Sequence, residues 1–143
     1  MVLALLNYHL GLQPYTHILE PQSAVTDEDV VLIMGSVERL AKEEPLQYVT
    51  GQAWFYGRTF NVSPDVLIPR PETEYLCRLA LEQAERCGLG GGAAVLDLCT
   101  GSGCIAWTMA LELSGSRVFA VDLSDAALKV ASSQGFSSDG PVF

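Results

Sequence analysis

Basic residues are scarce in this sequence. Its 143 residues include 8 lysines and arginines against 17 aspartates and glutamates, which gives a formal net charge of -9. Proteins that bind nucleic acid usually carry a basic face, because neutralising the phosphates drives that binding. The composition therefore argues against a broad contact with nucleic acid and is compatible only with a narrow, shape-specific one.

Long apolar runs and paired cysteines are also missing. No apolar run approaches the roughly 18 residues of a membrane span, and the apolar start Met1–Leu6 lacks the basic flank of a secretory signal. We therefore expect a cytoplasmic protein without a membrane segment, whose thiols stay reduced. The four cysteines show no C-x-x-C pair and no metal-ligand spacing, so no metal site is expected; they are Cys77, Cys87, Cys99 and Cys104.

The first 46 residues have a helical pattern. The segment Thr26–Asp29 is typical of a helix N-terminus, with a capping hydroxyl followed by three acids. The apolar spacing that follows predicts a helix to about Glu43, before Pro45. Residues 1–12 read as the tail of an earlier helix and residues 13–25 as a connection.

Residues 47–66 change to β character. The glycines at 51 and 57 punctuate a run of strand-forming side chains, which predicts a β-hairpin turning near Gly57-Arg58. We interpret the aromatic residues gathered here as core, with a ligand surface as the alternative. The strand formers are Tyr48, Val49, Trp54, Phe55, Tyr56, Phe60 and Val62.

Proline flanks Arg70 on both sides, as Pro69 and Pro71. Proline fixes its own φ and disfavours helical backbone in the preceding residue, so extended backbone is predicted at Arg70. The charge of Arg70 has two interpretations, a contact near a ligand or a salt bridge to Glu72 or Glu74.

The second half predicts a β-α-β unit. Two short apolar strands, Ala93–Leu98 and Arg117–Val121, flank a glycine turn at Cys99–Gly103 and a helix over Cys104–Leu113. Asp122 follows the second strand directly. This order is typical of parallel sheets that bind adenosine-containing cofactors. Helices are also predicted before and after this unit, over 72–87 and 125–134.

Two classes of cofactor compete for this turn. Gly101–Ala106 matches the G-x-G-x-x-A pattern of dinucleotide sites, and Asp122 stands where an acid accepts hydrogen bonds from ribose hydroxyls. S-adenosylmethionine is the alternative, since Asp97 would suit its positively charged end and would sit poorly beside a pyrophosphate. Asp97 could instead cap the N–H groups of the turn, so its role stays open.

Four segments carry a resemblance to a known family. V-L-D-L-C-T-G-S-G-C-I-A (Val95–Ala106) resembles motif I of class I methyltransferases. V-L-I-P-R-P-E-T-E (Val66–Glu74), with P-L-Q-Y-V-T-G (Pro45–Gly51) and F-Y-G (Phe55–Gly57), resembles the HemK/PrmC family of release-factor N5-glutamine methyltransferases. The resemblance covers about residues 1–134.

The resemblance implies an α/β fold and an S-adenosylmethionine cofactor. Three parts are expected: an incomplete helical substrate-recognition domain over 1–46, a β-hairpin linker over 47–68, and over 69–143 the first part of a class I Rossmann-like domain. The implied substrate is the glutamine of the Gly-Gly-Gln motif in class 1 peptide-release factors. The cofactor side would be formed by Asp97, Cys99, Thr100, Gly101, Ser102, Gly103 and Asp122, and a substrate-side loop by Pro69, Arg70, Pro71, Glu72 and Thr73.

The sequence departs from the family in several places. Most class I methyltransferases have glycine where Cys99 stands, the family usually has further helix before Met1, and residues 137–143 look foreign to it. The catalytic N-P-P-Y motif is absent, because asparagine occurs only at Asn7 and Asn61. We therefore expect no catalytic residue on this chain, no turnover alone, and poor solubility or self-association through surfaces that the rest of the sheet would cover. The alternatives are a non-catalytic fragment that docks on a release factor, the sister enzyme acting on a ribosomal-protein glutamine, and a dinucleotide-dependent oxidoreductase.

Overall fold

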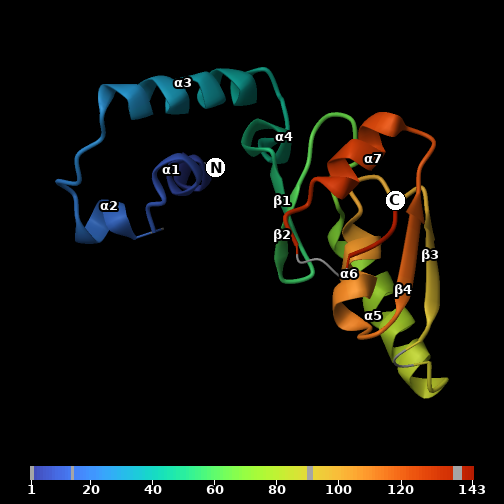
Figure 1. The fold of residues 1–143 in the computed structure, drawn as a ribbon. Coiled ribbons are helices and arrows are strands. Elements are labelled where there is room, and N and C mark those ends of the chain that lie inside the picture. Colours follow the sequence, from blue (N-terminus) through green and yellow to red (C-terminus); the bar gives the residue numbers. More distant parts are fainter. Residues whose placement is uncertain (1, 14, 90–91, 137–139) are drawn as a thin grey trace. The chain divides into compact units, whose positions relative to one another are not determined.

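The computed structural model describes residues 2–13, 15–89, 92–136 and 140–143 (Figure 1). The chain divides into two compact units, Met1–Thr50 and Gly51–Phe143, where the sequence predicts three segments. Within the described residues, no helix combines the length and the apolar character needed to cross a membrane.

The regular elements that the structure describes in the first unit are all helices. It contains α1 (Val2–Leu10), α2 (Thr16–Leu19), α3 (Asp27–Ala41) and α4 (Leu46–Thr50). Thr26 caps α3 as predicted: its hydroxyl accepts from the Asp29 N–H, and the Asp29 carboxylate accepts from the Thr26 N–H in return. Helix α1 packs on α3, where His9 Nε2 lies 2.8 Å from Ser36 Oγ.

Two helices of this unit correct the sequence prediction. Helix α2 lies in the segment predicted to be a connection, and α4 contains Tyr48 and Val49, which were predicted to form a strand. The Pro45 carbonyl accepts from the N–H groups of both residues, and the Arg39 guanidinium donates to the carbonyls of both. Because these bonds come partly from a distant side chain, tertiary context overrides the local β-propensity.

The second unit begins with the predicted hairpin. Strands β1 (Gln52–Phe55) and β2 (Arg58–Asn61) pair antiparallel, with Phe55 opposite Arg58. The two turn residues, Tyr56 and Gly57, have φ values of 49° and 76°, as a tight hairpin turn requires. The Tyr56 N–H donates to Glu74 Oε1 at 3.0 Å, which ties this turn to the helix that follows.

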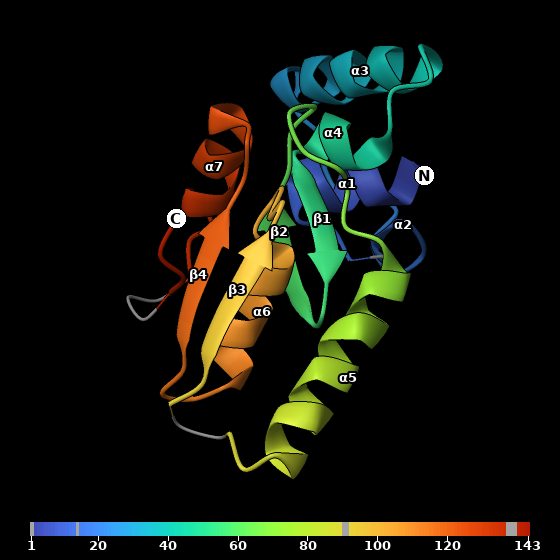
Figure 2. The same cartoon turned by 90° about the vertical axis from the view of Figure 1, so that its right-hand side faces the viewer.

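The β-α-β unit is present at the predicted place. Strands β3 (Ala94–Leu98) and β4 (Arg117–Val121) pair in parallel and are joined by α6 (Cys104–Glu112). Helix α5 (Pro71–Arg86) precedes them and α7 (Asp125–Ser132) follows. Figure 2 shows α6 behind the two strands.

The core of this unit is aromatic. Phe55 and Phe60 are fully buried, and Phe60 packs edge-on against Phe136, which in turn contacts Trp107 of α6. Trp54 is different, since 69% of it is exposed. The hairpin aromatics therefore divide: the two phenylalanines are core, as interpreted from the sequence, and Trp54 lies on the surface.

The end of the chain adds to the sheet edge. Val142 forms a parallel bridge with Phe119 of β4. Its N–H donates to the Val118 carbonyl, and its carbonyl accepts from the Ala120 N–H. Residues 137–143 do not resemble the family in sequence. Of these, 137–139 lie outside the described residues, and Val142 extends the sheet.

One face of the sheet is uncovered. Asp97, Val118 and Ala120 are buried toward α6, whereas the alternate residues of both strands are exposed. In Figure 1 the strands are seen nearly edge-on with this face free, and in Figure 2 it faces the viewer. The exposed apolar residues are Leu96, Leu98, Phe119 and Val121.

We predict that this face makes the chain self-associate, because contiguous apolar surface is unfavourable in water. Replacing both Leu96 and Phe119, which lie opposite each other, by threonine keeps strand propensity and should shift the chain toward the monomer. Size-exclusion chromatography with light scattering measures this.

The control is Leu67→Thr, since Leu67 is 71% exposed but lies outside the sheet. It should leave the association unchanged. A sharp monomer peak for the unchanged chain would contradict the prediction.

Candidate cofactor site

The turn between β3 and α6 is built from left-handed backbone. Cys99, Gly101 and Gly103 have φ values of 62°, 55° and 78°. Glycine suits two of these positions because it has no Cβ, whereas Cys99 adopts a conformation that side chains disfavour. At Gly103 a Cβ would also lie 3.0 Å from the Ala131 Cβ, so a side chain there would crowd the contact between the turn and α7.

Asp122 holds the turn from the end of β4. Its Oδ2 accepts from the Gly101 N–H at 2.9 Å, and its Oδ1 accepts from the Ser124 N–H at 3.0 Å. The bond from Ser124, and then that from Gly101, lowers the pKa of Asp122, so the side chain is a carboxylate at neutral pH. The Leu123 backbone lowers this pKa further, and since a carboxylate offers about four lone-pair positions, capacity remains for a further donor.

Asp97 is a buried residue of β3, the strand that precedes the turn, and it bonds the turn from there. Its Oδ2 accepts from the Thr100 hydroxyl at 2.7 Å. Burial is the largest influence and raises the pKa of Asp97, while the bonds from Thr100 and the Ala106 backbone lower it and the charge of Asp122 raises it further. Asp97 thus bonds a hydroxyl of the turn and an N–H group of α6, and not the N–H groups of the turn that the sequence had it cap. A role toward the cofactor stays a prediction.

The sequence reasoning missed Gln134, which contacts the same turn. Its Nε2 donates to the Ser102 carbonyl at 3.0 Å, and only 3% of the residue is exposed. The one signal in the sequence is a polar residue at the end of the apolar stripe of α7. Helix periodicity alone does not reveal what such a residue bonds.

The thiols near the site have different surroundings. Burial raises the pKa of Cys77 to about 12 and that of Cys104 to about 11, so neither is a ready nucleophile. Cys99 and Cys87 are exposed, and all four cysteines are free. Among the described residues, no three His, Cys, Asp or Glu side chains are grouped to hold a metal ion.

The predicted substrate-side residues form a separate group at the start of α5. Arg70 is exposed and extended, with φ −102° and ψ 143°, and follows the half-buried Pro69. Pro71 is the first residue of the helix, so Glu72 and Thr73 lie in its first turn. Within the described part of the chain, Arg70 makes no salt bridge to Glu72 or Glu74. The Glu74 carboxylate instead accepts from Tyr56 of the hairpin.

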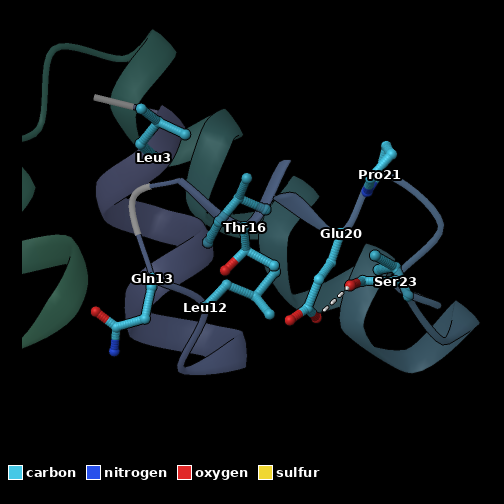
Figure 3. Close-up of a pocket in the computed structure, with 9 residues that line it drawn as sticks. Leu3, Leu12, Gln13, Thr16, Glu20, Pro21 and Ser23 are labelled. Carbon is cyan, nitrogen blue, oxygen red and sulfur yellow. Dashed lines mark hydrogen bonds between the residues drawn. The ribbon is translucent and has the colours of Figure 1, made fainter. Parts of the chain in front are cut away.

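The first unit has a small apolar cavity of about 180 Å³ (Figure 3). Leucine side chains from α1 and the segment after it line the cavity, and Glu20 at its edge accepts from the Ser23 hydroxyl at 3.3 Å. None of the site residues predicted from the sequence lies in it. Its apolar lining comes from Leu3, Leu6, Leu12, Pro21 and Val25.

The arrangement in the second unit defines a class of protein. Parallel strands joined through a glycine turn and a helix, with an acid at the end of the second strand, are typical of α/β proteins that bind nucleosides. The other unit has a match of its own, since residues 2–51 match the family model of the PrmC N-terminal domain.

Relatives of known name match most of the chain. It is 42% identical over 129 residues to the release factor glutamine methyltransferase of Chlorobaculum tepidum, covering 89% of this chain and 44% of that protein. It is 47% identical over 111 residues to the enzyme of the same name from Koribacter versatilis, covering 78% and 39%. For the Bacillus subtilis enzyme the identity is 40% over 129 residues, covering 90% and 45%. The chain thus spans less than half the length of these relatives, and it belongs to the HemK/PrmC family.

We predict that Asp97→Asn raises the stability of the chain at pH 7. An asparagine can accept from the Ala106 N–H and donate to the Thr100 hydroxyl, so it keeps both bonds and removes the buried charge. Because folding raises the pKa of Asp97, its charge costs stability above the folded pKa. The gain should therefore shrink as the pH falls through the folded pKa, and vanish below the ordinary value of 3.8, where the carboxyl is protonated in both states.

Thermal unfolding between pH 4 and pH 7 measures this gain. Asp65→Asn is the matched control, because Asp65 also accepts from a hydroxyl, that of Ser63, but is exposed. A loss of stability at pH 7 in Asp97→Asn would show that the carboxylate is a net stabilising cap.

Proposed function

We propose that this chain is the cofactor-binding part of an S-adenosylmethionine-dependent protein N5-glutamine methyltransferase. The substrate would be the glutamine of the Gly-Gly-Gln motif in a class 1 peptide-release factor. The observation that carries the proposal is the turn Cys99–Gly103 held by Asp122, in a chain about 40% identical to proteins named release factor glutamine methyltransferase. The free thiols fit a reducing, cytoplasmic location.

The residues of the turn fit the proposed cofactor. Gly101 has nothing within 4 Å of where its Cβ would be, so a ligand can approach the backbone there. Asp122 keeps lone-pair capacity that can accept from a ribose hydroxyl. Cys99, Thr100, Ser102 and Gly103 complete the side of the turn, and the carboxylate of Asp97 would face the positively charged methionine end. We propose with it that residues 69–143 form the first part of a Rossmann-like domain, after a helical domain over 1–46 and a linker over 47–68.

The chemistry explains why the chain should bind without turnover. S-adenosylmethionine supplies an electrophilic methyl group. The acceptor, an amide nitrogen, is a weak nucleophile because its lone pair is delocalised, so catalysis depends on fixing and polarising that amide. In the family the N-P-P-Y motif does this, and the sequence has no such motif. The 143 residues therefore supply the cofactor side and, through Pro69–Thr73, one side of the substrate entrance.

The test of cofactor class is titration with S-adenosylmethionine and with NAD by calorimetry. We expect S-adenosylmethionine to bind and to slow the alkylation of Cys99 by iodoacetamide, because Cys99 lies exposed in the turn. Cys87, exposed at the end of α5, is the internal control and should react at the same rate with and without ligand. Binding of NAD alone would overturn the proposal.

The test of the substrate uses radiolabelled S-adenosylmethionine with a class 1 release factor. We expect the chain to transfer no methyl group above background. A pull-down with the same factor measures whether the helical unit still docks, and a ribosomal protein carrying the sister enzymes' glutamine serves as the comparison. Measurable transfer would refute the proposed lack of turnover, and docking on the ribosomal protein alone would change the proposed substrate.

A further inference from the structure

Gln134 is a buried polar residue whose amide is fully bonded. It follows α7, and only 3% of it is exposed. Its Nε2 lies 2.9 Å from the Asn61 carbonyl, 3.0 Å from that of Ser102 and 3.2 Å from that of Val130. Its Oε1 accepts from the Asn61 N–H at 2.7 Å. The side chain thus joins three separate parts of the unit: strand β2, the turn Cys99–Gly103 (the cofactor turn) and α7.

The bond to Ser102 completes a pattern in the turn. Three consecutive residues are each held by a different side chain: Thr100 by Asp97, Gly101 by Asp122, and Ser102 by Gln134. Asp97 belongs to β3, and Asp122 directly follows β4. Gln134 comes from the opposite side and bonds the hairpin at the same time.

Packing alone does not account for an amide at this position. Burying a primary amide costs free energy unless its donors and acceptor are satisfied, and an apolar side chain of the same size would fill the space without that cost. The amide is useful where several backbone groups must be held at fixed distances from one another. All of its partners here are backbone groups, and two of them, Asn61 and Ser102, belong to segments that are distant in the sequence.

We infer that Gln134 is a positioning residue for the cofactor turn. It holds the Ser102 carbonyl relative to β2, and this fixes the geometry of the backbone between Cys99 and Gly103. The inference rests on the proposed function only for the identity of the cofactor. The positioning of the turn itself can be measured without ligand.

The experiment compares Gln134→Met with the unchanged chain. Methionine matches glutamine in size and loses all of the hydrogen bonds. We expect the dissociation constant for S-adenosylmethionine to rise about tenfold, which is the effect of losing an interaction as strong as one typical hydrogen bond. We also expect Cys99 to be alkylated several-fold faster relative to Cys87 in the absence of ligand, because the turn is no longer held.

Asn61→Ala is the matched control. The Asn61 side chain donates to the Ser133 carbonyl, so it joins the same strand to the end of α7 but does not touch the turn. It should change the melting temperature without changing the ratio of Cys99 to Cys87 alkylation or the cofactor affinity. If Gln134→Met matches this control in both readouts, the inference is overturned.

Two further results, no binding of S-adenosylmethionine and an unfolded Gln134→Met, also have a defined meaning. If the unchanged chain binds no S-adenosylmethionine, the proposed function fails, and the alkylation ratio alone decides the inference. If Gln134→Met does not fold, Gln134→Glu replaces it, since glutamate still accepts from the Asn61 N–H but donates to Ser102 only when protonated. In Gln134→Glu, the ratio of Cys99 to Cys87 alkylation should be higher than in the unchanged chain at pH 7 and should approach it as the pH is lowered. If the two ratios are already equal at pH 7, the inference is overturned.

Discussion

The hydrogen bond from the Gly101 N–H to the Asp122 carboxylate is the contact on which the site depends. It continues the pairing of the strands beyond their last residues, since the Thr100 N–H already donates to the Val121 carbonyl. The turn therefore starts as an extension of the sheet and ends as the N-terminus of α6. Left-handed backbone at Gly101 and Gly103 makes that change of direction possible, and the close approach of Ala131 to Gly103 seats α7 beside it.

Local signals made the centre of the fold predictable from the sequence. Both sheet strands, the hairpin turn at Gly57, the cap of α3 and the place of Asp122 follow from patterns within a few residues. What the sequence did not reveal depends on distant partners. The Tyr48 and Val49 carbonyls are bonded by the side chain of Arg39 in α3, Val142 joins the sheet edge through β4, and Gln134 gains its role only once the hairpin lies beside the turn.

The two carboxylates of the site have opposite electrostatic conditions. Asp122 is at the surface, and backbone N–H groups stabilise its charge, so its pKa falls. Asp97 is buried, and two hydrogen bonds do not offset the loss of water, so its pKa rises. A buried acid that costs stability is the kind of group that a ligand of opposite charge can compensate. Asp122, in contrast, stabilises the turn already in the free protein, so accepting from the ribose of the proposed cofactor would require no rearrangement.

This difference bears on the class of cofactor. The charge of Asp122 itself raises the pKa of Asp97, so the turn lies in a negative potential. A pyrophosphate placed there would add two negative charges beside a carboxylate that burial already disfavours. A ligand with a sulfonium and an ammonium group would instead stabilise the ionised form of Asp97 and lower its pKa. The glycine pattern is common to both classes of ligand, so the electrostatics of Asp97, more than the glycines, favours S-adenosylmethionine.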